Sequence, residues 1–199
     1  MTDAESLADE NTDDFDGAAI KAKAGSSVVL TGTGTLIVNG NCKNGIKISD
    51  LDADDKNDGY SEASFIIDGE DLTINITASN DGINSGTDLT IKSGTITVAA
   101  GDDGIKADYI LTIGEEGTDG PVINIISCAE GLEGTVVNIL GGDITFEGVW
   151  DDDKGVREIL VSVYERSNEA NYFIKEQKAV VNDDKTWSYS LYTKTSSRA

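Results

Sequence analysis

The chain has 199 residues, which suffices for one sizeable hydrophobic core or for one core with a small second module. It carries 37 Asp and Glu residues against 15 Lys and Arg, giving a formal net charge of −22. This charge argues against nucleic acid and anionic membranes as partners, because an acidic surface repels phosphate groups and attracts cations. No run approaches the roughly 18 apolar residues of a membrane span, so no membrane insertion is expected.

Short glycine-containing motifs recur along the chain, and each is followed by an aliphatic residue that we call an anchor. The anchors are Ile20, Ile46, Ile83, Ile105, Leu132 and, in a weaker motif, Val156. The intervals between them are 26, 37, 22, 27 and 24 residues, and all but one are close to the length of one solenoid coil. The segment from Asn80 to Ile105, which begins NDGI and ends DDGI, is therefore interpreted as one coil.

Two short strands separated by a polar turn are predicted within each interval. The first strands read SVVLT, DLTIK, YILTI and TVVNI, and the second read TLIVNG, TITVAA, VINII and DITFEG. Apolar residues alternate with Thr, Asn or Lys, as in strands with one buried and one exposed face. At each corner, glycine is expected to supply permissive backbone angles. The pattern predicts an all-β parallel β-helix of about five to six coils, with a sandwich of hairpins as the alternative.

The longest interval contains an insertion, SDLDADDKNDGYSEAS at residues 49–64, which we expect to project as a loop from one corner. Its acidic residues suggest calcium binding: Asp50, Asp52, Asp54, Asp55, Asp58 and Glu62. The spacing of an EF-hand is not met, because Gly59 at the sixth loop position puts Lys56 at the third and Phe65 at the twelfth. A solvated acidic loop is the favoured interpretation.

The pattern changes after Trp150, where glycine becomes rare and most of the aromatic residues occur. Segments EILVSVYE, NYFIKEQKAVV and TWSYSLYT are typical of longer strands, and antiparallel pairing is one option for them. We therefore divide the chain into a β-helix domain at residues 1–148 and a C-terminal β-rich segment at residues 149–199. This segment either caps the helix or belongs to a truncated sandwich-like module.

The succession GTGTLIVNGNCKNGIKIS, NDGINSGTDLTIKSGTITVAAGDDGIKAD and SCAEGLEGTVVNILGGDITF resembles a bacterial family over about residues 15–148. The family comprises calcium-binding, right-handed parallel β-helix carbohydrate-binding proteins of clostridial and related cell surfaces, which are similar in shape to pectate lyases. The resemblance implies a right-handed helix, bound Ca²⁺, a polysaccharide partner and an extracellular or cell-surface location. Because family members are expected to carry an export leader and more coils, the chain is interpreted as an interior fragment, expected to be monomeric.

Stacking the coils on their anchors places acidic residues in columns. The position two before the anchor holds Ala18, Asn44, Asp81, Asp103, Glu130 and Lys154. Like charges about 5 Å apart repel by roughly 1 kcal/mol or more, so a neutralising cation is expected. Zinc and iron are poorly supported because the chain has no His and only two Cys, whereas calcium prefers oxygen ligands.

The candidate calcium ligands are Asn80, Asp81, Asp102, Asp103, Glu130 and Glu133. In the alternative interpretation these side chains only form turns and face water. The two cysteines, Cys42 and Cys128, share the position four before the anchor, three coil steps apart. A separation of roughly 14 Å exceeds the ~7 Å Cα limit of a disulfide, so two free, largely buried thiols are predicted.

A pectate lyase of this shape needs a base, usually Arg or Lys, beside a calcium-bound uronate. No Arg precedes Arg157, and the regular candidates are Lys47 and Lys106, each directly after its anchor. A lysine beside several carboxylates is expected to stay protonated, so a salt-bridging lysine is favoured and catalysis ranks second.

Binding requires less, because outward Thr, Asn, Ser and Lys side chains offer partners to sugar hydroxyls. Lys106, Tyr60 and Tyr109 are the candidate carbohydrate-binding residues, and each tyrosine is also consistent with an ordinary loop or edge position. The predicted function is non-catalytic, calcium-dependent binding of a plant cell-wall-type polysaccharide, cellulose-like or pectic (polygalacturonate), at the bacterial surface. A calcium-dependent pectate lyase acting by β-elimination and a structural or adhesive surface stalk are the alternatives.

Overall fold

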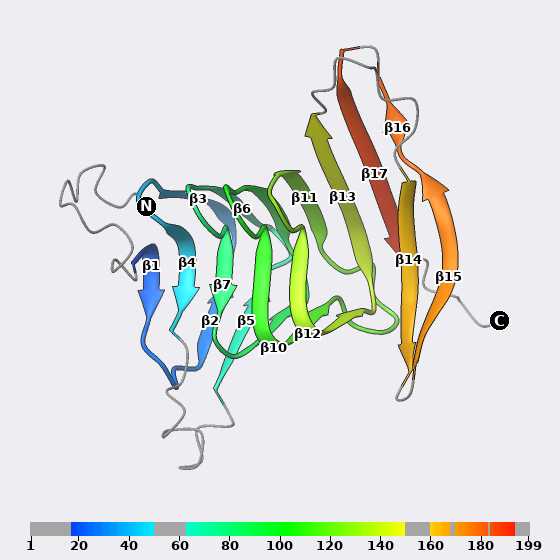
Figure 1. Ribbon diagram of the computed structural model, residues 1–199. Helices are drawn as coiled ribbons and strands as arrows, with labels where there is room; N and C mark the ends of the chain where they lie inside the picture. The colour runs from blue at the N-terminus through cyan, green and yellow to red at the C-terminus, as the bar shows by residue number, and fades with distance from the viewer. Residues whose placement is uncertain (1–16, 50–62, 150–159, 168–169, 183, 194–199) are drawn as a thin grey trace.

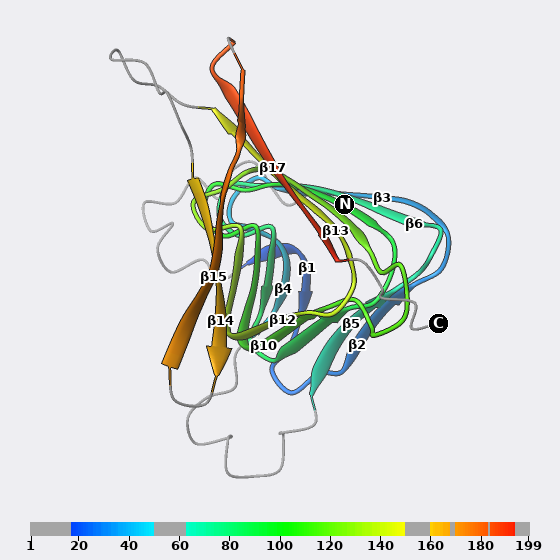
Figure 2. The same ribbon diagram turned by 90° about the vertical axis from the view of Figure 1, so that its right-hand side faces the viewer.

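A computed structural model describes residues 17–49, 63–149, 160–167, 170–182 and 184–193 of the chain. All regular secondary structure in these ranges is β-strand, which confirms the expected all-β class. The strands from β1 to β13 run around three faces of one solenoid-like, nearly closed body (Figure 1), which Figure 2 shows from the side of its last strands. Within each face, neighbouring strands of successive coils are parallel.

The three faces contain strands from successive coils, so that each coil contributes one strand to each face. The first face contains β1 (Ala18–Ala22), β4 (Asn44–Ile48), β7 (Ile83–Ser85) and the first parts of β10 (Ile105–Ile113) and β12 (Leu132–Ile139). The second contains β2 (Val28–Thr31), β5 (Ser64–Asp68), β8 (Asp88–Ile91) and the second parts of β10 and β12. The third contains β3 (Gly34–Gly40), β6 (Leu72–Ala78), β9 (Thr95–Ala99), β11 (Val122–Ser127) and β13 (Gly142–Val149).

The anchor alignment is confirmed by the register of the first face. Its paired residues run in one column from coil to coil: Ile20, Ile46, Ile83, Ile105 and Leu132. The sequence pattern predicts two strands and a corner per coil, and the structure has three strands, because the anchor itself lies on a short strand. Its side chain enters the core, with Ile83 and Ile105 completely buried. The weaker anchor, Val156, lies outside the described residues.

The glycines that precede the anchors have a different role from the one predicted. Gly45, Gly82, Gly104 and Gly131 are not among the glycines with positive φ. A Cβ on Gly82 would lie 2.6 Å from the carbonyl oxygen of Gly104 in the next coil, and one on Gly104 would lie 2.7 Å from that of Gly131. These glycines are therefore needed because successive coils approach closely at this corner, and the prediction of permissive backbone angles is wrong here.

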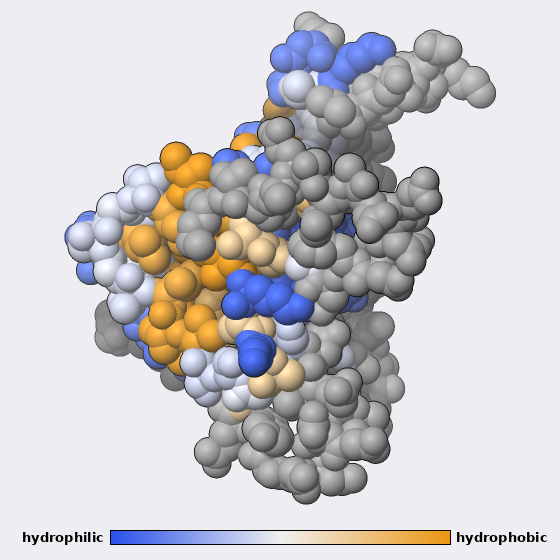
Figure 3. Space-filling view, turned by 90° about the vertical axis from the view of Figure 1, so that its left-hand side faces the viewer, coloured by the Kyte–Doolittle hydropathy of each residue, from blue (hydrophilic) through white to orange (hydrophobic). Residues whose placement is uncertain are grey.

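The core consists of inward-facing aliphatic columns from the three faces. On the third face one column runs from Leu36 through Ile74, Ile96, Ile123 and Ile144. The next outward column, by contrast, contains Ile37 followed by Asn75, Thr97, Asn124 and Thr145. Figure 3 views the β1 end of the body, where apolar side chains gather because no earlier coil among the described residues packs on them. Alternation in the sequence thus gives an apolar interior and a mainly polar outer face.

The insertion of the longest interval lies between β4 and β5, where the chain passes from the first face to the second. Residues 50–62, which include its six acidic candidates and Tyr60, lie outside the described residues. The calcium and carbohydrate predictions for this loop therefore remain predictions.

The C-terminal strands pair antiparallel, which was one option for them from sequence. Strand β17 (Thr186–Thr193) pairs with β13 along its whole length, and β16 (Val180–Val181) pairs with β17. Strands β14 (Leu160–Ser167) and β15 (Ala170–Lys178) form a separate two-stranded sheet. Strands β13 and β17 belong to one sheet, so hydrogen bonds cross the predicted division between residues 148 and 149. The division itself remains a prediction.

Candidate functional site

The predicted acidic column lies at the corner where the chain enters the first face. The backbone carbonyl of each acidic member accepts a hydrogen bond from the glycine that follows the previous member of the column. Gly45 N donates to Asp81 O at 2.9 Å, Gly82 N to Asp103 O at 2.9 Å, and Gly104 N to Glu130 O at 2.8 Å. Asn44, Asp81 and Asp103 are only 1%, 3% and 3% exposed. The column is thus a continuous feature of the corner, and its inner carboxylates are largely removed from water.

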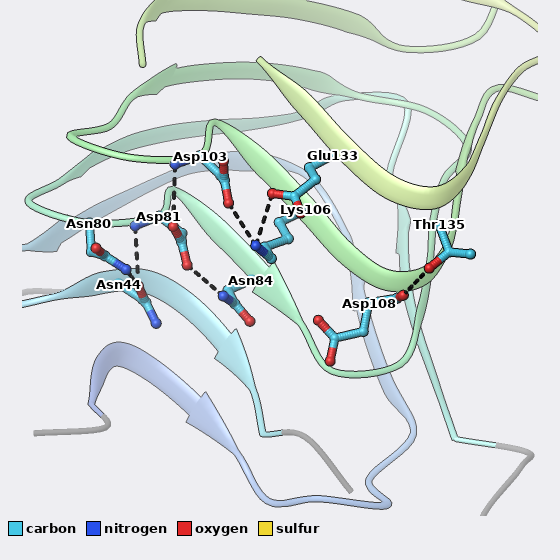
Figure 4. Close-up of polar contacts among 9 residues, drawn as sticks. All are labelled: Asn44, Asn80, Asp81, Asn84, Asp103, Lys106, Asp108, Glu133 and Thr135. Carbon is cyan, nitrogen blue, oxygen red and sulfur yellow. Dashed lines mark hydrogen bonds and ion pairs between the residues drawn. The ribbon is translucent and has the colours of Figure 1, made fainter. Parts of the chain in front are cut away.

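Side chains of this column bind the backbone of the following coil (Figure 4). The Asn44 Oδ1 atom accepts hydrogen bonds from the Asp81 N–H at 3.2 Å and from the Asn80 side-chain amide at 3.0 Å. In the same way, Asp81 Oδ1 accepts one from the Asp103 N–H at 3.3 Å, and Asp81 Oδ2 accepts one from the Asn84 side-chain amide. Asn44 and Asp81 therefore join adjacent coils through these hydrogen bonds, in addition to any role in forming the turn.

Lys106 follows its anchor and neutralises part of the acidic corner. Its Nζ lies 3.0 Å from Asp103 Oδ2 and 2.8 Å from Glu133 Oε2. The hydrogen bonds to Glu133 and Asp103 raise the pKa of Lys106, outweighing the opposing effect of burial. The prediction of a salt-bridging lysine is confirmed at this position.

Three carboxylates at the corner form a group that could hold a metal ion. One oxygen each from Asp81, Asp102 and Asp103 lie within 4.8 Å of one another. Asp102 is exposed, so solvent reaches the group from its side. Oxygen donors of this kind fit a hard cation such as Ca²⁺ or Mg²⁺, and backbone carbonyls and water would complete the coordination.

The other three candidate ligands lie near this group without joining it. The Asn80 amide is used by Asn44, and the Glu133 carboxylate is paired with Lys106. Glu130 is exposed and has Asp103, Asp102 and Glu133 as its neighbouring charges. Sequence reasoning missed Asn84, which holds Asp81; the available signal was its position directly after the anchor, equivalent to that of Lys106.

Comparisons with protein-family models, curated proteins and solved structures find no match. The corner is therefore interpreted from its own residues. Separately, no helix long and apolar enough to cross a membrane occurs in the part of the chain that the structure describes.

Two of the three predicted carbohydrate-binding residues lie together. Lys106 and Tyr109 line an open hollow of about 370 Å³ with Ala107, Asp108, Glu133, Gly134 and Thr135. Tyr109 is 39% exposed, and one wall is joined to the other by the Thr135 hydroxyl, which donates to Asp108 O at 2.8 Å. The hollow adjoins the acidic corner through Lys106 and Glu133.

The cysteines form no disulfide with one another, as predicted, and each is partly buried, whereas largely buried thiols were predicted. Burial, followed by the charges of Asp103 and Glu130, raises the pKa of the Cys128 thiol. Both cysteines lie four residues before their anchors, in the turn that leads from the third face into the first face.

The charge of Glu130 gives the corner a pH dependence. Partial desolvation, followed by the charge of Asp103 and a hydrogen bond with its side chain, raises the pKa of Glu130 above its ordinary value of 4.5. The Glu130 carboxyl therefore binds its proton more tightly in the folded chain than in the unfolded chain. The resulting stability is present below pH 4.5 and is lost as pH rises through the folded-state pKa.

We expect Glu130→Gln to flatten this part of the stability profile. In thermal unfolding followed from pH 4 to about pH 7 in the presence of chelator, the unsubstituted chain should lose more stability than the variant. Glu116→Gln, at an exposed position, is the control. Parallel profiles for the unsubstituted chain and Glu130→Gln would contradict the assignment.

Proposed function

We propose that the chain is a right-handed parallel β-helix that binds a plant cell-wall-type polysaccharide at the bacterial surface through calcium, without catalysis. The cluster of Asp81, Asp102 and Asp103 carries this proposal. Its carboxylate oxygens lie within 4.8 Å of one another, and two of its members are 3% exposed. Calcium relieves the repulsion between such carboxylates and offers remaining coordination positions to hydroxyl or carboxylate oxygens of a sugar.

The polar outer columns support binding along an extended chain. On the third face, Asn75, Thr97 and Asn124 pair in register and therefore repeat at the spacing of the coils, about 4.8 Å. The neighbouring outward column contains Thr35, Thr73 and Thr95. Hydroxyl and amide groups in such rows both donate and accept hydrogen bonds, as recognition of sugar hydroxyls requires.

Lys106 favours binding over lyase chemistry. A base that removes a proton beside a uronate carboxylate must be deprotonated, whereas Glu133 and Asp103 hold Lys106 in its protonated form. Its Nζ is also occupied by two carboxylates on one side. Lys106 therefore neutralises part of the negative charge of the corner and is not available as a base.

Affinity electrophoresis in gels containing a cellulose-like or a pectic polysaccharide tests the proposal. We expect retardation in at least one gel, weaker retardation in chelator and recovery of the full retardation with added Ca²⁺. Asp102→Asn should raise the Ca²⁺ concentration that retardation requires, because it removes one carboxylate of the cluster. Asp143→Asn, an exposed carboxylate on β13, is the matched control.

Each opposing outcome contradicts a different part of the proposal. Retardation that chelator leaves unchanged contradicts the calcium requirement. Accumulation of an unsaturated, ultraviolet-absorbing product identifies a lyase. No retardation in either gel contradicts polysaccharide binding and favours the structural stalk.

A further inference from the structure

A second candidate site lies outside the acidic corner, where β17 meets the end of the coils. A groove of about 610 Å³ runs between the turn from β11 to β12 and the paired strands β13 and β17. Its surface is formed mainly by apolar side chains, among them Ile126, Phe146, Trp187 and Tyr189. Concave apolar surfaces with a few polar groups at the edge are the usual form of small-ligand sites.

Two glycines allow the aromatic rings of this groove to lie against the backbone. A Cβ on Gly148 would lie 2.4 Å from Trp187 Nε1, and a Cβ on Gly131 would lie 2.5 Å from Phe146 Cε1. The pairing of β13 with β17 places Trp187 opposite Gly148 and Tyr189 opposite Phe146. The rings are thus held in defined positions, and Trp187 and Tyr189 line the groove because β17 pairs with β13 of the third face.

The charges around the groove disfavour an anionic occupant. Glu147 lies in its lining, and Glu130 lies between the lining residues Ala129 and Gly131. The neighbouring carboxylates Asp103 and Glu130 also raise the pKa of Cys128, another lining residue, after burial. In a chain of net charge −22, this setting repels an anionic ligand such as a uronate.

The groove is continuous with the acidic corner. The turn from Cys128 to Gly131 lines the groove and also takes part in the corner, where Ala129 N donates to Asp102 O at 2.8 Å. A polysaccharide held at the corner would therefore have a second contact surface directly beside it. Aromatic rings fit this part, because a sugar ring presents an aliphatic C–H face while Trp and Tyr combine an apolar ring with a polar edge.

We propose that this groove binds an uncharged sugar ring by stacking against Trp187, with Phe146 and Tyr189 forming the apolar wall. The assignment rests on the proposed polysaccharide function, and it assigns the neutral, β-glucan-type part of that substrate class to this groove. Glu147 and Ser127 also line the groove. The Glu147 carboxylate can accept hydrogen bonds from sugar hydroxyls, and the Ser127 hydroxyl can both donate and accept them.

Tryptophan fluorescence tests the proposal directly. The chain has two tryptophans, so Trp150→Phe leaves Trp187 as the single reporter. In chelator, a soluble cello-oligosaccharide should change its emission saturably, whereas an oligogalacturonate should not. Measuring in chelator separates the groove from the corner, because no calcium is then bound at the corner. If gels show no calcium-dependent retardation but Trp187 emission still responds to the cello-oligosaccharide, only the proposed calcium function is contradicted.

Two substitutions provide the affinity measurement. By calorimetry, Trp187→Ala should weaken cello-oligosaccharide binding by about tenfold or more, since it removes the stacking ring. Ile126→Arg, at a rim residue that is 44% exposed, should block the groove without disturbing the core. Val180→Ala, on the exposed strand β16, should bind as the unsubstituted chain does.

The variants keep the proposal falsifiable even if Trp187→Ala does not fold, because Ile126→Arg leaves all aromatic residues in place. Unchanged binding in Ile126→Arg, or no response of Trp187 emission to the cello-oligosaccharide, would overturn the groove assignment. A response to an apolar peptide but not to the sugar would also overturn it and identify a protein-binding groove instead.

Discussion

Replacing Gly82 by alanine is expected to lower the free energy of unfolding by about 3 kcal/mol. The new Cβ would lie 2.4 Å from Val98 Cγ1 and 2.6 Å from the Gly104 carbonyl oxygen. Neither neighbour has room to move, because Val98 is completely buried and Gly104 O accepts a hydrogen bond from Ile83 N at 3.1 Å. Urea denaturation measures the loss, and thermal unfolding should show a fall of roughly 6–12 °C.

Gly117→Asn is the matched control for this prediction. Gly117 has a φ of 83° and nothing within 4 Å of an added Cβ. Asn tolerates the left-handed region better than most residues, so the free energy of unfolding should change by less than about 0.5 kcal/mol. Equal effects of the two substitutions would show that close approach of the coils is not the reason for glycine at the corner.

Calcium is expected to stabilise the chain through Asp81, Asp102 and Asp103. At a concentration one hundred times the dissociation constant, a ligand of the folded state adds about 2.7 kcal/mol. For a chain of this length, that corresponds to a rise of roughly 5–10 °C in the unfolding temperature. Differential scanning fluorimetry with and without Ca²⁺, starting from chelated protein, measures it.

Asp102→Asn isolates the metal contribution in this experiment. Asp102 is exposed, and the hydrogen bonds that join the coils at this corner use the side chains of Asn44 and Asp81 instead. The variant should therefore unfold like the unsubstituted chain in chelator and gain at most half of its calcium shift. An equal calcium shift in both chains, or none up to millimolar Ca²⁺, would contradict a site at this cluster. Asp143→Asn should keep the full shift.

The repeated motifs predicted the register of the first face correctly, because the spacing of a solenoid-like body recurs along the chain. Each coil makes the same path around the core, so the anchor has to return after one coil length, and the aligned anchors from Ile20 to Leu132 do pair in register. The column through Asp81 and Asp103 followed from the same alignment. The strand count per coil did not follow, because the three-residue strand β7 has no alternation long enough to distinguish it from a turn.

Distances between coils could not be predicted from composition. The glycines before the anchors were assigned a role in backbone angles, whereas the structure shows that a Cβ would meet the next coil. The pairing of acids was equally hidden: Asp81 is bound by Asn84, while Asp103 is bound by Lys106, although the two acids occupy equivalent positions. Such choices depend on side-chain reach across a stack, which the spacing of a motif does not contain.

The sequence by itself determined the β class, the coil length, the inward aliphatic columns and the gathering of acids at one corner, because all of these depend on periodicity along the chain. Tertiary structure alone decided that Asp102, rather than Glu130, completes the close group of carboxylates. It also decided that Trp187 comes to lie beside Phe146 and Gly148, since β17 returns from a non-repeating region to pair with β13. Contacts between segments distant in the sequence require a register that only the folded chain establishes.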